Sequence, residues 1–417
     1  MTRKIFVVSL QVENCIIMLI YNISILLYKL GVYVVSWFKP EVKKMRKGEK
    51  EAVEKILKVR KEGQKWVWVH AASLGEFEQG RPLIERIKAK EANTKILLSF
   101  FSPSGYEVRK NYNLADLVVY LPLDTPTNAR RFVEAANPTK VYIIKYEFWL
   151  NYLKCLRTRG IETYIVSAIF RKNQVFFKWY GGIFRQGLKA FKTLYVQNEE
   201  SKELLAEIGF KNVVVAGDTR FDRVNDIANA AKQLPIAEAF ANKEMTLVVG
   251  SSWQPDEELL CRWINKHTEY KMIIAPHHVE ENRIREIEGL LNRKSVRYTQ
   301  CTSDKDVEGA DVLIINTIGL LSSIYQYGSV AYIGGGFGVG IHNTLEAAVW
   351  GMPVVFGPNF GKFKEAKELI ACQGGFSIST YDEMESIFSK VFSGSYGEKA
   401  AEYVKSKVGA SQLIIEN

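Results

Sequence analysis

The sequence predicts two α/β domains in tandem, each built on a parallel sheet covered by helices, preceded by an apolar N-terminal helix. Three observations predict this arrangement. The chain has 417 residues, which suits two domains of ordinary size. Short apolar runs alternate with amphipathic stretches in two separate series. A long apolar segment precedes the first series.

The N-terminal apolar segment, residues 16–38, is about as long as a helix that crosses a bilayer. One charge, Lys29, interrupts it, and aromatic residues typical of membrane interfaces are spread along it. From Lys39 to Lys65 there are eleven Lys or Arg against five Asp or Glu, which favours anionic headgroups. We therefore predict a membrane anchor, ahead of a cleaved signal peptide or a buried first helix. Whether it spans or embeds, and whether Met18 is the natural start, stay open.

Two series of apolar runs predict the strands of the two sheets. The first series comprises residues 66–72, 95–101, 117–123, 140–144, 163–169, 193–197 and 213–217. The second comprises residues 246–252, 271–276, 312–316, 330–336 and 352–358. A polar, helical stretch around residues 223–243 separates the two series. The predicted domains are an anchor with its basic flank over 1–45, a Rossmann-like domain over 46–235, and a second one with C-terminal helices over 236–417.

The distribution of charge and of cysteines argues against nucleic-acid binding, a metal site and disulfide bonds. The net charge of +10 favours anionic partners, but the basic run lies beside the anchor and no nucleic-acid recognition motif appears. We therefore expect no nucleic-acid partner. Asp304 and Asp306 form a D-x-D in a polar loop with no strand before it, which indicates a solvated turn rather than a metal site. The cysteines are scattered without a CxxC pair, which argues against disulfides and zinc: Cys15, Cys155, Cys261, Cys301 and Cys372.

The strongest local signal in the first domain lies at residues 68–90. A buried strand ends at His70, a turn of small residues follows, and a helix opens near Glu76. A carboxylate at a helix start is favoured by the helix dipole, and beside a cleft it can serve as a general base. Ser73 and Glu76 also fit the S-x-x-E capping box, which the local sequence favours. Both roles hold only if Glu76 turns away from the cap.

A glycine-rich turn at residues 334–358 is the main signal in the second domain. Gly334, Gly335 and Gly336 end a buried strand, and we predict a helix beginning near His342. Glycines let a ligand approach the backbone, and amides at a helix start bind phosphate. Glu346, expected one turn into that helix, is placed to bind ribose hydroxyls. The spacing fits neither a dinucleotide fingerprint nor a P-loop. A turn without a ligand is the weaker alternative.

Polar residues follow three other strands of the second series. They are Ser251 and Ser252, His277 and His278, and Asn316 and Thr317. Because the carboxyl ends of parallel strands share one edge of a sheet, we expect these residues to face the same cleft as the glycine turn. Each of them alone is equally compatible with a capping role.

Together these residues resemble the Kdo (3-deoxy-D-manno-octulosonic acid) transferase family over roughly residues 20–380. The similar motifs occur in one order: HAASLGEFEQGRPLI (70–84), SFFSPSG (99–105), YLPLDTP (120–126), YEFWLN (146–151), AGDTRFDRV (216–224), GSSWQPDEE (250–258), APHH (275–278) and GGGFGVGIHNTLEAAVWGMPVVFGP (334–358). The N-terminal anchor agrees with the same resemblance.

The resemblance implies a GT-B fold whose two Rossmann-like domains face a cleft, with the acceptor bound by the first and the nucleotide sugar by the second. It implies an inverting transfer of Kdo from CMP-Kdo to the 6′ hydroxyl of a tetraacylated lipid A precursor (lipid IVA) in lipopolysaccharide biosynthesis. No cofactor and no catalytic metal are implied. The enzyme would lie at the cell inner membrane with its catalytic domains on the cytoplasmic side.

The resemblance also assigns residues to roles. The catalytic base falls on Glu76, and the acceptor-side candidates are Ser73, Gly75 and Glu147. The donor site falls on Ser252, His278, Asn316, Gly334, Gly335, Gly336, His342, Asn343 and Glu346. Arg220 replaces a lysine of the family and is a cation suited to the donor's carboxylate or phosphate.

The sequence departs from the family at several of these motifs. Lys145 stands where the family has an acidic residue, Leu150 replaces a proline, and His277 replaces an arginine. Asn316 replaces an aspartate. These departures fit a divergent branch with a somewhat different acceptor. Two alternatives stay open: another GT-B transferase that uses a UDP-sugar on a membrane lipid, and an inactive membrane-bound protein that binds a nucleotide sugar.

Overall fold

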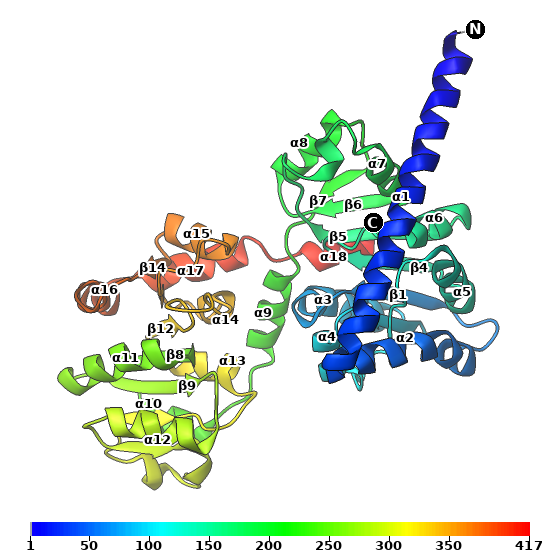
Figure 1. Ribbon diagram of the computed structural model, residues 1–417. Helices are drawn as coiled ribbons and strands as arrows, with labels where there is room; N and C mark the ends of the chain where they lie inside the picture. Colours follow the sequence, from blue (N-terminus) through cyan, green and yellow to red (C-terminus); the bar gives the residue numbers. More distant parts are fainter. Residues whose placement is uncertain (1) are drawn as a thin grey trace. The chain divides into compact units, whose positions relative to one another are not determined.

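The computed structural model describes the backbone of residues 2–417 and the side chains of residues 16–417. Met1, the first residue of the predicted domain 1–45, and the side chain of Cys15 lie outside this description. The chain divides into an N-terminal unit, Met1–Arg223 with Gly409–Asn417, and a C-terminal unit, Val224–Val408 (Figure 1). The two units are described separately below.

The N-terminal unit contains a seven-stranded, wholly parallel sheet in the order β3-β2-β1-β4-β5-β6-β7. Its strands are β1 (Trp66–Ala71), β2 (Lys95–Phe100), β3 (Leu117–Tyr120), β4 (Lys140–Ile144), β5 (Glu162–Ala168), β6 (Thr193–Val196) and β7 (Val213–Val215). Nearly all of their side chains are buried, because helices cover both faces of such a sheet. This burial explains why the strands read as continuous apolar runs.

The helices of this unit follow the strands in alternation. They are α1 (Thr2–Phe38), α2 (Pro40–Val59), α3 (Leu74–Lys90), α4 (Pro103–Arg109), α5 (Pro126–Ala136), α6 (Leu150–Thr158), η1 (Val175–Phe177), α7 (Gly182–Leu188) and α8 (Glu199–Glu207). Helix α9 (Arg220–Asn229) continues into the C-terminal unit. Residues Ile16–Phe38 of α1 have a mean hydropathy of 1.7 and are long and apolar enough to cross a membrane.

The C-terminal unit contains a second parallel sheet of seven strands in the order β10-β11-β9-β8-β12-β13-β14. Its strands are β8 (Thr246–Ser252), β9 (Lys271–Pro276), β10 (Ser295–Arg297), β11 (Val312–Ile314), β12 (Val330–Ile333), β13 (Val354–Phe356) and β14 (Gly375–Ser377). Its helices are α10 (Pro235–Ala241), α11 (Gln254–Lys266), α12 (Glu281–Leu290), α13 (Leu321–Ile324), α14 (Leu345–Ala348), α15 (Lys364–Ala371), α16 (Tyr381–Ser393) and α17 (Tyr396–Lys405).

The predicted strands are all present, and β10 and β14 are two strands that the sequence analysis missed. Both have three residues and lie at opposite edges of the second sheet. An edge strand is covered on fewer sides, so its residues need not form an apolar run. The fold class of two Rossmann-like, parallel-sheet units behind an apolar helix is confirmed.

The C-terminal helix α18 (Ala410–Glu416) belongs to the N-terminal unit. The carboxylate of Asp222 accepts hydrogen bonds from the backbone N–H of Gly409 at 2.6 Å, the N–H of Ser411 at 2.7 Å and the hydroxyl of Ser411 at 2.6 Å. These bonds hold the start of α18. The sequence assigned residues 236–417 to the second domain, whereas contacts divide the chain at Arg223 and return its last residues to the first unit.

The first strand of each unit lies at the point where the strand order reverses. Strand β1 lies between β2 and β4, and β8 lies between β9 and β12. Ligands of doubly wound sheets bind beyond the carboxyl ends of the strands at such a point. Lys145, Ser167 and Ser251 adopt left-handed backbone, with φ of 61°, 54° and 53°, at the carboxyl ends of β4, β5 and β8. Strained backbone in this position is a common property of functional sites.

Candidate functional site

Glu76 lies in the first turn of α3, directly beyond the carboxyl end of β1. Its Oε2 accepts a hydrogen bond from the backbone N–H of Ser73 at 3.1 Å and lies 3.5 Å from the Ser73 hydroxyl. The capping box predicted from the sequence is therefore present. The carboxylate has not turned away from the cap, contrary to the condition set from the sequence for a catalytic role. Because the cap bond uses Oε2, the two roles can coexist only if they use different oxygens.

Charged residues from other elements surround this carboxylate. Burial raises the pKa of Glu76, and the negative charge of Glu147 raises it further. Lys145 and His70 act in the opposite direction but do not cancel the rise. Lys145 and Glu147 follow β4, the strand that pairs with β1, which explains how they approach Glu76. A carboxyl group with a raised pKa at a strand end is a candidate for a general base.

His70 and Glu147 connect this cluster to the core of the sheet. His70 is 1% exposed, and its Nε2 lies 3.4 Å from the Glu147 carboxylate. Its Nδ1 lies 2.8 Å from the Ser99 hydroxyl, which accepts a hydrogen bond from the indole N–H of Trp68. The indole N–H of Trp149 donates to Glu147 at 2.6 Å. The carboxylate of Glu147 is therefore held in place, and it can position the groups next to it.

The other acceptor-side candidates, Ser73 and Gly75, lie in the same turn as Glu76. Ser73 is partly buried and Gly75 is exposed. A Cβ added to Gly75 would meet nothing within 4 Å. No steric requirement for glycine is evident at this position.

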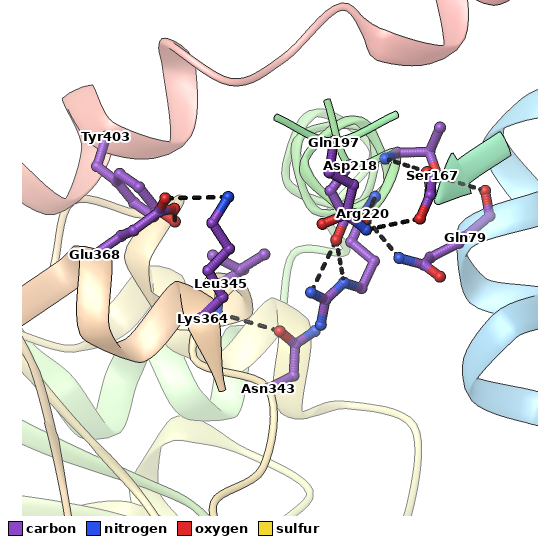
Figure 2. A network of polar contacts seen from close by, with 11 residues as sticks. Gln79, Ser167, Gln197, Asp218, Arg220, Asn343, Leu345, Lys364, Glu368 and Tyr403 are labelled. Carbon is purple, nitrogen blue, oxygen red and sulfur yellow. Dashed lines mark hydrogen bonds and ion pairs between the residues drawn. The ribbon is translucent and has the colours of Figure 1, made fainter. Parts of the chain in front are cut away.

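Arg220 is paired with a buried carboxylate of its own unit (Figure 2). Its Nε donates to Asp218 Oδ2 at 2.9 Å, and Gln79 donates to Oδ1 of the same carboxylate at 2.8 Å. Burial would raise the pKa of Asp218, but the guanidinium and these bonds lower it overall. Asp218 thus compensates part of the positive charge of Arg220, the residue that the sequence analysis proposed for binding the anionic groups of the donor.

The glycine turn of the C-terminal unit is required by backbone packing. A Cβ on Gly334 would lie 2.3 Å from the Ser251 carbonyl oxygen, and one on Gly336 would lie 2.6 Å from the Cα of Gly357. Gly335 has a φ of 89°, a conformation that glycine adopts without strain. The N–H of Gly334 donates to the Gly250 carbonyl, so this amide is already used within the fold. Packing therefore explains these glycines independently of any ligand.

The buried carboxylate of Asp256 fixes the glycine turn at Gly334–Gly336 by hydrogen bonds. Its Oδ2 accepts hydrogen bonds from the backbone N–H of Gly335 at 2.8 Å and of Trp253 at 2.9 Å, and its Oδ1 accepts from the Tyr332 hydroxyl at 2.8 Å. Burial raises the pKa of Asp256, although these three bonds act in the opposite direction. The sequence analysis did not single out this residue.

Trp253 contacts three histidines, His277, His278 and His342, beyond the carboxyl ends of β8, β9 and β12. Its indole N–H donates to His342 Nε2 at 3.1 Å, and its ring stacks on His277 with centroids 4.7 Å apart. His277 also stacks on His342 at 4.8 Å, and His278 contacts the indole edge-on at 5.2 Å. Burial lowers the pKa of His342 and of His277, so their neutral forms are favoured. The predicted residues His278 and His342 thus lie together.

The helix after the glycine turn differs from the prediction. It begins at Leu345 rather than near His342 and spans one turn, Leu345–Ala348, so Glu346 is its second residue. The side-chain oxygen of Asn343 accepts from the N–H of Leu345 at 3.2 Å (Figure 2). Its amide nitrogen donates to Glu346 at 2.9 Å. Asn343 thus forms a local turn immediately before the N-cap residue Thr344, and the helix expected for phosphate binding begins only after it.

Ser252 and Asn316 have partners other than the glycine turn. The hydroxyl of Ser252 is buried and donates to Glu257 at 2.9 Å. Asn316 exchanges two hydrogen bonds with Thr299, accepting from its N–H at 3.1 Å and donating to its hydroxyl at 2.7 Å. Asp306, in the polar loop, accepts from the N–H groups of Thr302 and Ser303, as expected for a turn.

Trp253 and Asp256 were not predicted to belong to these sites, and His70 and Lys145 were noted without a role, whereas His277 was predicted to face the cleft together with His278. His70, Lys145 and His277 follow or end a strand, which is the positional signal that the sequence analysis used for other residues. Trp253 and Asp256 belong to the motif GSSWQPDEE, in which Asp256 lies three residues after the N-cap. Within the residues that the structure describes, no group of three or more His, Cys, Asp or Glu side chains could hold a metal ion.

The chain matches a known family over its first unit. Residues 45–223 match the family described as 3-Deoxy-D-manno-octulosonic-acid transferase (kdotransferase). This range contains the predicted motifs from HAASLGEFEQGRPLI to AGDTRFDRV.

Curated relatives extend the similarity into the second unit. The chain is 27% identical over 335 residues to a 3-deoxy-D-manno-octulosonic acid transferase of Aquifex aeolicus, covering 78% of this chain and 86% of the relative. It is 26% identical over 319 residues to the protein of the same name from Bordetella pertussis, covering 72% and 73%.

Solved structures share the fold. A UDP-GlcNAc 2-epimerase of Neisseria meningitidis bound to UDP-GlcNAc matches with a TM-score of 0.58 and 16% identity, covering 85% of this chain and 99% of that chain. At this identity the similarity shows a common architecture of two Rossmann-like units.

Proposed function

We propose that this glycosyltransferase, which is related to the Kdo transferases, moves Kdo from CMP-Kdo to the 6′ hydroxyl of a tetraacylated lipid A precursor, with inversion, in lipopolysaccharide biosynthesis. The family match and the curated relatives support Kdo as the transferred sugar. The observation that carries the mechanism is the carboxylate of Glu76 beyond the end of β1, with Lys145, Glu147 and His70 around it.

Glu76 is the proposed base. As the acceptor hydroxyl attacks the anomeric carbon of the donor, its proton passes to the carboxylate of Glu76, and the bond from that carbon to the CMP phosphate breaks. Oε2 keeps the cap bond to Ser73, and the other oxygen, Oε1, takes the proton. Glu147, held by Trp149, and the neighbouring Ser73 and Gly75 are proposed to contact the acceptor sugar.

The donor is assigned to the turn of the C-terminal unit. The backbone around Gly334–Gly336, the ring of His342, which stacks on His277, and the ring of His278 are proposed to receive the nucleotide, with Asn343 and Glu346 at the ribose. Ser252 and Asn316 keep only a supporting role, because other side chains already bond them. Arg220 is proposed for the donor's anionic groups, in competition with Asp218.

The apolar part of α1 supports membrane association, since a lipid acceptor presents its sugar at a membrane surface. We propose the inner membrane as the location, with both units on the cytoplasmic side, where the basic flank after α1 meets anionic lipid. Holding the enzyme at that surface raises the effective concentration of the acceptor.

A donor comparison tests this function. The full-length protein is incubated with the tetraacylated precursor and with CMP-Kdo generated in situ, or with UDP-sugars in parallel, and the lipid product is weighed by mass spectrometry. The proposal predicts a product heavier by one or more Kdo units when CMP-Kdo is the donor, and no product with any of the UDP-sugars. Extension only with a UDP-sugar would assign the chain to another transferase of the same fold. No extension with any donor would favour an inactive nucleotide-sugar-binding protein.

A further inference from the structure

Helix α1 presents two different faces along its apolar part. Large apolar side chains are exposed on one face, and they recur at helical spacing: Leu19, Ile20, Ile23, Leu26, Leu27 and Leu30. The opposite face lies against the N-terminal unit, where Ile25 is 7% exposed and Ser36 is 3% exposed. Figure 1 shows this part of α1 running along the unit beside α2 and α6.

Polar groups fix the inner face of α1 to the unit. The hydroxyl of Tyr21 donates to the buried carboxylate of Asp124 at 2.6 Å and lies 3.3 Å from the backbone N–H of Leu150, which donates to it. The side chain of Asn151 donates to Asn22 at 2.9 Å. A helix held by such directional bonds in a low-dielectric interface has a defined position relative to the unit.

A cavity of about 440 Å³ lies under this fixed part of α1. Its size falls within the range of ligand pockets, roughly 300–1,000 Å³. One wall is Tyr21 and Ile25 of α1, and the rest is formed by the loop after β4, by η1 and by α7, with the aromatic side chains Phe148, Trp149, Phe176 and Phe184. Glu147 also lines the cavity.

Most of the residues that line this cavity are apolar, and several of its polar groups already have partners. Tyr21 donates its hydroxyl proton to Asp124, and Glu147 accepts from Trp149. The side-chain oxygen of Gln174 accepts from the backbone N–H of Arg171 at 3.0 Å. What these residues present to the cavity is mainly aromatic and aliphatic surface, which suits hydrocarbon better than a hydrated sugar or a phosphate.

The cavity adjoins both the membrane face and the proposed base. Ile25 lines it, while Ile23 and Leu26, its near neighbours in sequence on α1, belong to the exposed apolar face. On the other side, Glu147 lines the cavity and raises the pKa of Glu76 by its charge. A chain entering from lipid along α1 would therefore bring the group attached to it toward the carboxylates.

We propose that this cavity binds an acyl chain of the lipid acceptor, so that α1 is a wall of the acceptor site as well as an anchor. The inference rests on the proposed function, because it requires a lipid acceptor. It predicts that the enzyme distinguishes an acylated acceptor from its deacylated disaccharide through contacts of α1.

A pair of tryptophan substitutions on α1 tests this inference in the full-length enzyme. Ile25→Trp fills the cavity, and Ile23→Trp places the same ring on the outer face, where Ile23 is 47% exposed. We expect Ile25→Trp to lower kcat/KM for the tetraacylated precursor about tenfold, the loss of about 1.4 kcal/mol of chain burial. Its kcat/KM for the deacylated acceptor and both values for Ile23→Trp are expected to stay near wild type. An equal effect of Ile25→Trp on both acceptors, or no effect, overturns the inference.

A second measurement avoids any dependence on the folding of Ile25→Trp. The wild-type enzyme is photolysed with a precursor that carries a diazirine in one acyl chain, and the labelled peptides are mapped by mass spectrometry. Labels that fragmentation locates on Ile25 or Phe176 themselves support the inference, and labels confined to residues of the outer face of α1, such as Ile23, contradict it. If wild type extends neither acceptor with CMP-Kdo, the proposed function itself fails. If it extends both equally well, only the acyl-chain inference fails.

Discussion

Two carboxylates occupy equivalent positions in the two units and have different environments. Glu76 and Asp256 each lie three residues after the N-cap of the helix that follows the first strand of their unit, and each accepts a hydrogen bond from the backbone N–H of that N-cap residue. Asp256 is 1% exposed, and both of its oxygens accept hydrogen bonds from the fold. Glu76 is only partly buried, and charges of both signs lie close to it.

This difference separates an architectural carboxylate from a chemical one. The hydrogen bonds to Asp256 connect the start of α11, directly after β8, with the glycine turn, so Asp256 has a structural role. Glu76 keeps its cap with one oxygen, while its pKa responds to residues from another strand. The same position after an N-cap thus serves structure in one unit and holds the proposed base in the other. Substitutions of these residues test the difference between the two carboxylates.

The largest effect on stability is expected in the glycine turn. Gly336→Ala places a Cβ 2.6 Å from the backbone of Gly357, which cannot move without displacing β13, so we expect a loss of about 3 kcal/mol in the C-terminal unit. Gly338→Ala is the control, because a Cβ there meets nothing within 4 Å. Hydrogen exchange of peptides covering residues 330–360 in the full chain measures both. Equal protection in the two variants would show that packing does not require Gly336.

A smaller loss is expected when Asp256 is neutralised. Asp256→Asn keeps the shape but replaces one acceptor oxygen by a donor, so one buried N–H or hydroxyl loses its partner, at a cost of about 2–3 kcal/mol. The matched change Glu76→Gln should cost less than about 1 kcal/mol, since glutamine also completes a capping box. Denaturant unfolding of the full chain compares them. If Glu76→Gln is the more destabilising change, the division between the two carboxylates is wrong.

The smallest expected effect is a pair of opposite shifts in the pH dependence of transfer. A base must be ionised, and the raised pKa of Glu76 places the acid limb of kcat/KM above the usual carboxyl range. Glu147→Gln removes a negative neighbour, so it should lower the pKa of Glu76 and move that limb to lower pH. Lys145→Gln removes a positive neighbour and should move the limb to higher pH. Shifts in the same direction would show that these charges do not act on the base.

Much of the fold could be predicted because buried parallel strands are apolar runs of four to seven residues. The two missed strands, Ser295–Arg297 and Gly375–Ser377, are short edge strands without that signal. The return of α18 to the first unit depends on Asp222, whose contacts with Gly409 and Ser411 join positions far apart in the chain. A contact between residues so far apart in the chain cannot be predicted from a local sequence pattern.

Position in the sequence indicated Glu76 and Glu147 as candidates, whereas the charges that act on Glu76 depend on its neighbours in the fold. Glu76 could be found because it follows a strand and opens a helix. Its electrostatic partners, Lys145 and Glu147, are brought to it by strand pairing, which the local sequence does not contain. The glycines at 334–336 were predicted to serve a ligand, yet steric packing against Ser251 and Gly357 already requires glycine.

The most direct test of the account is transfer by Glu76→Gln in the full-length enzyme, measured together with binding of CMP-Kdo. Removing a general base typically costs a factor of about 10²–10⁴ in rate, so we expect transfer to fall at least a hundredfold while the dissociation constant of CMP-Kdo stays near that of wild type. Transfer at close to the wild-type rate by the purified variant would contradict the assignment of Glu76 as the base.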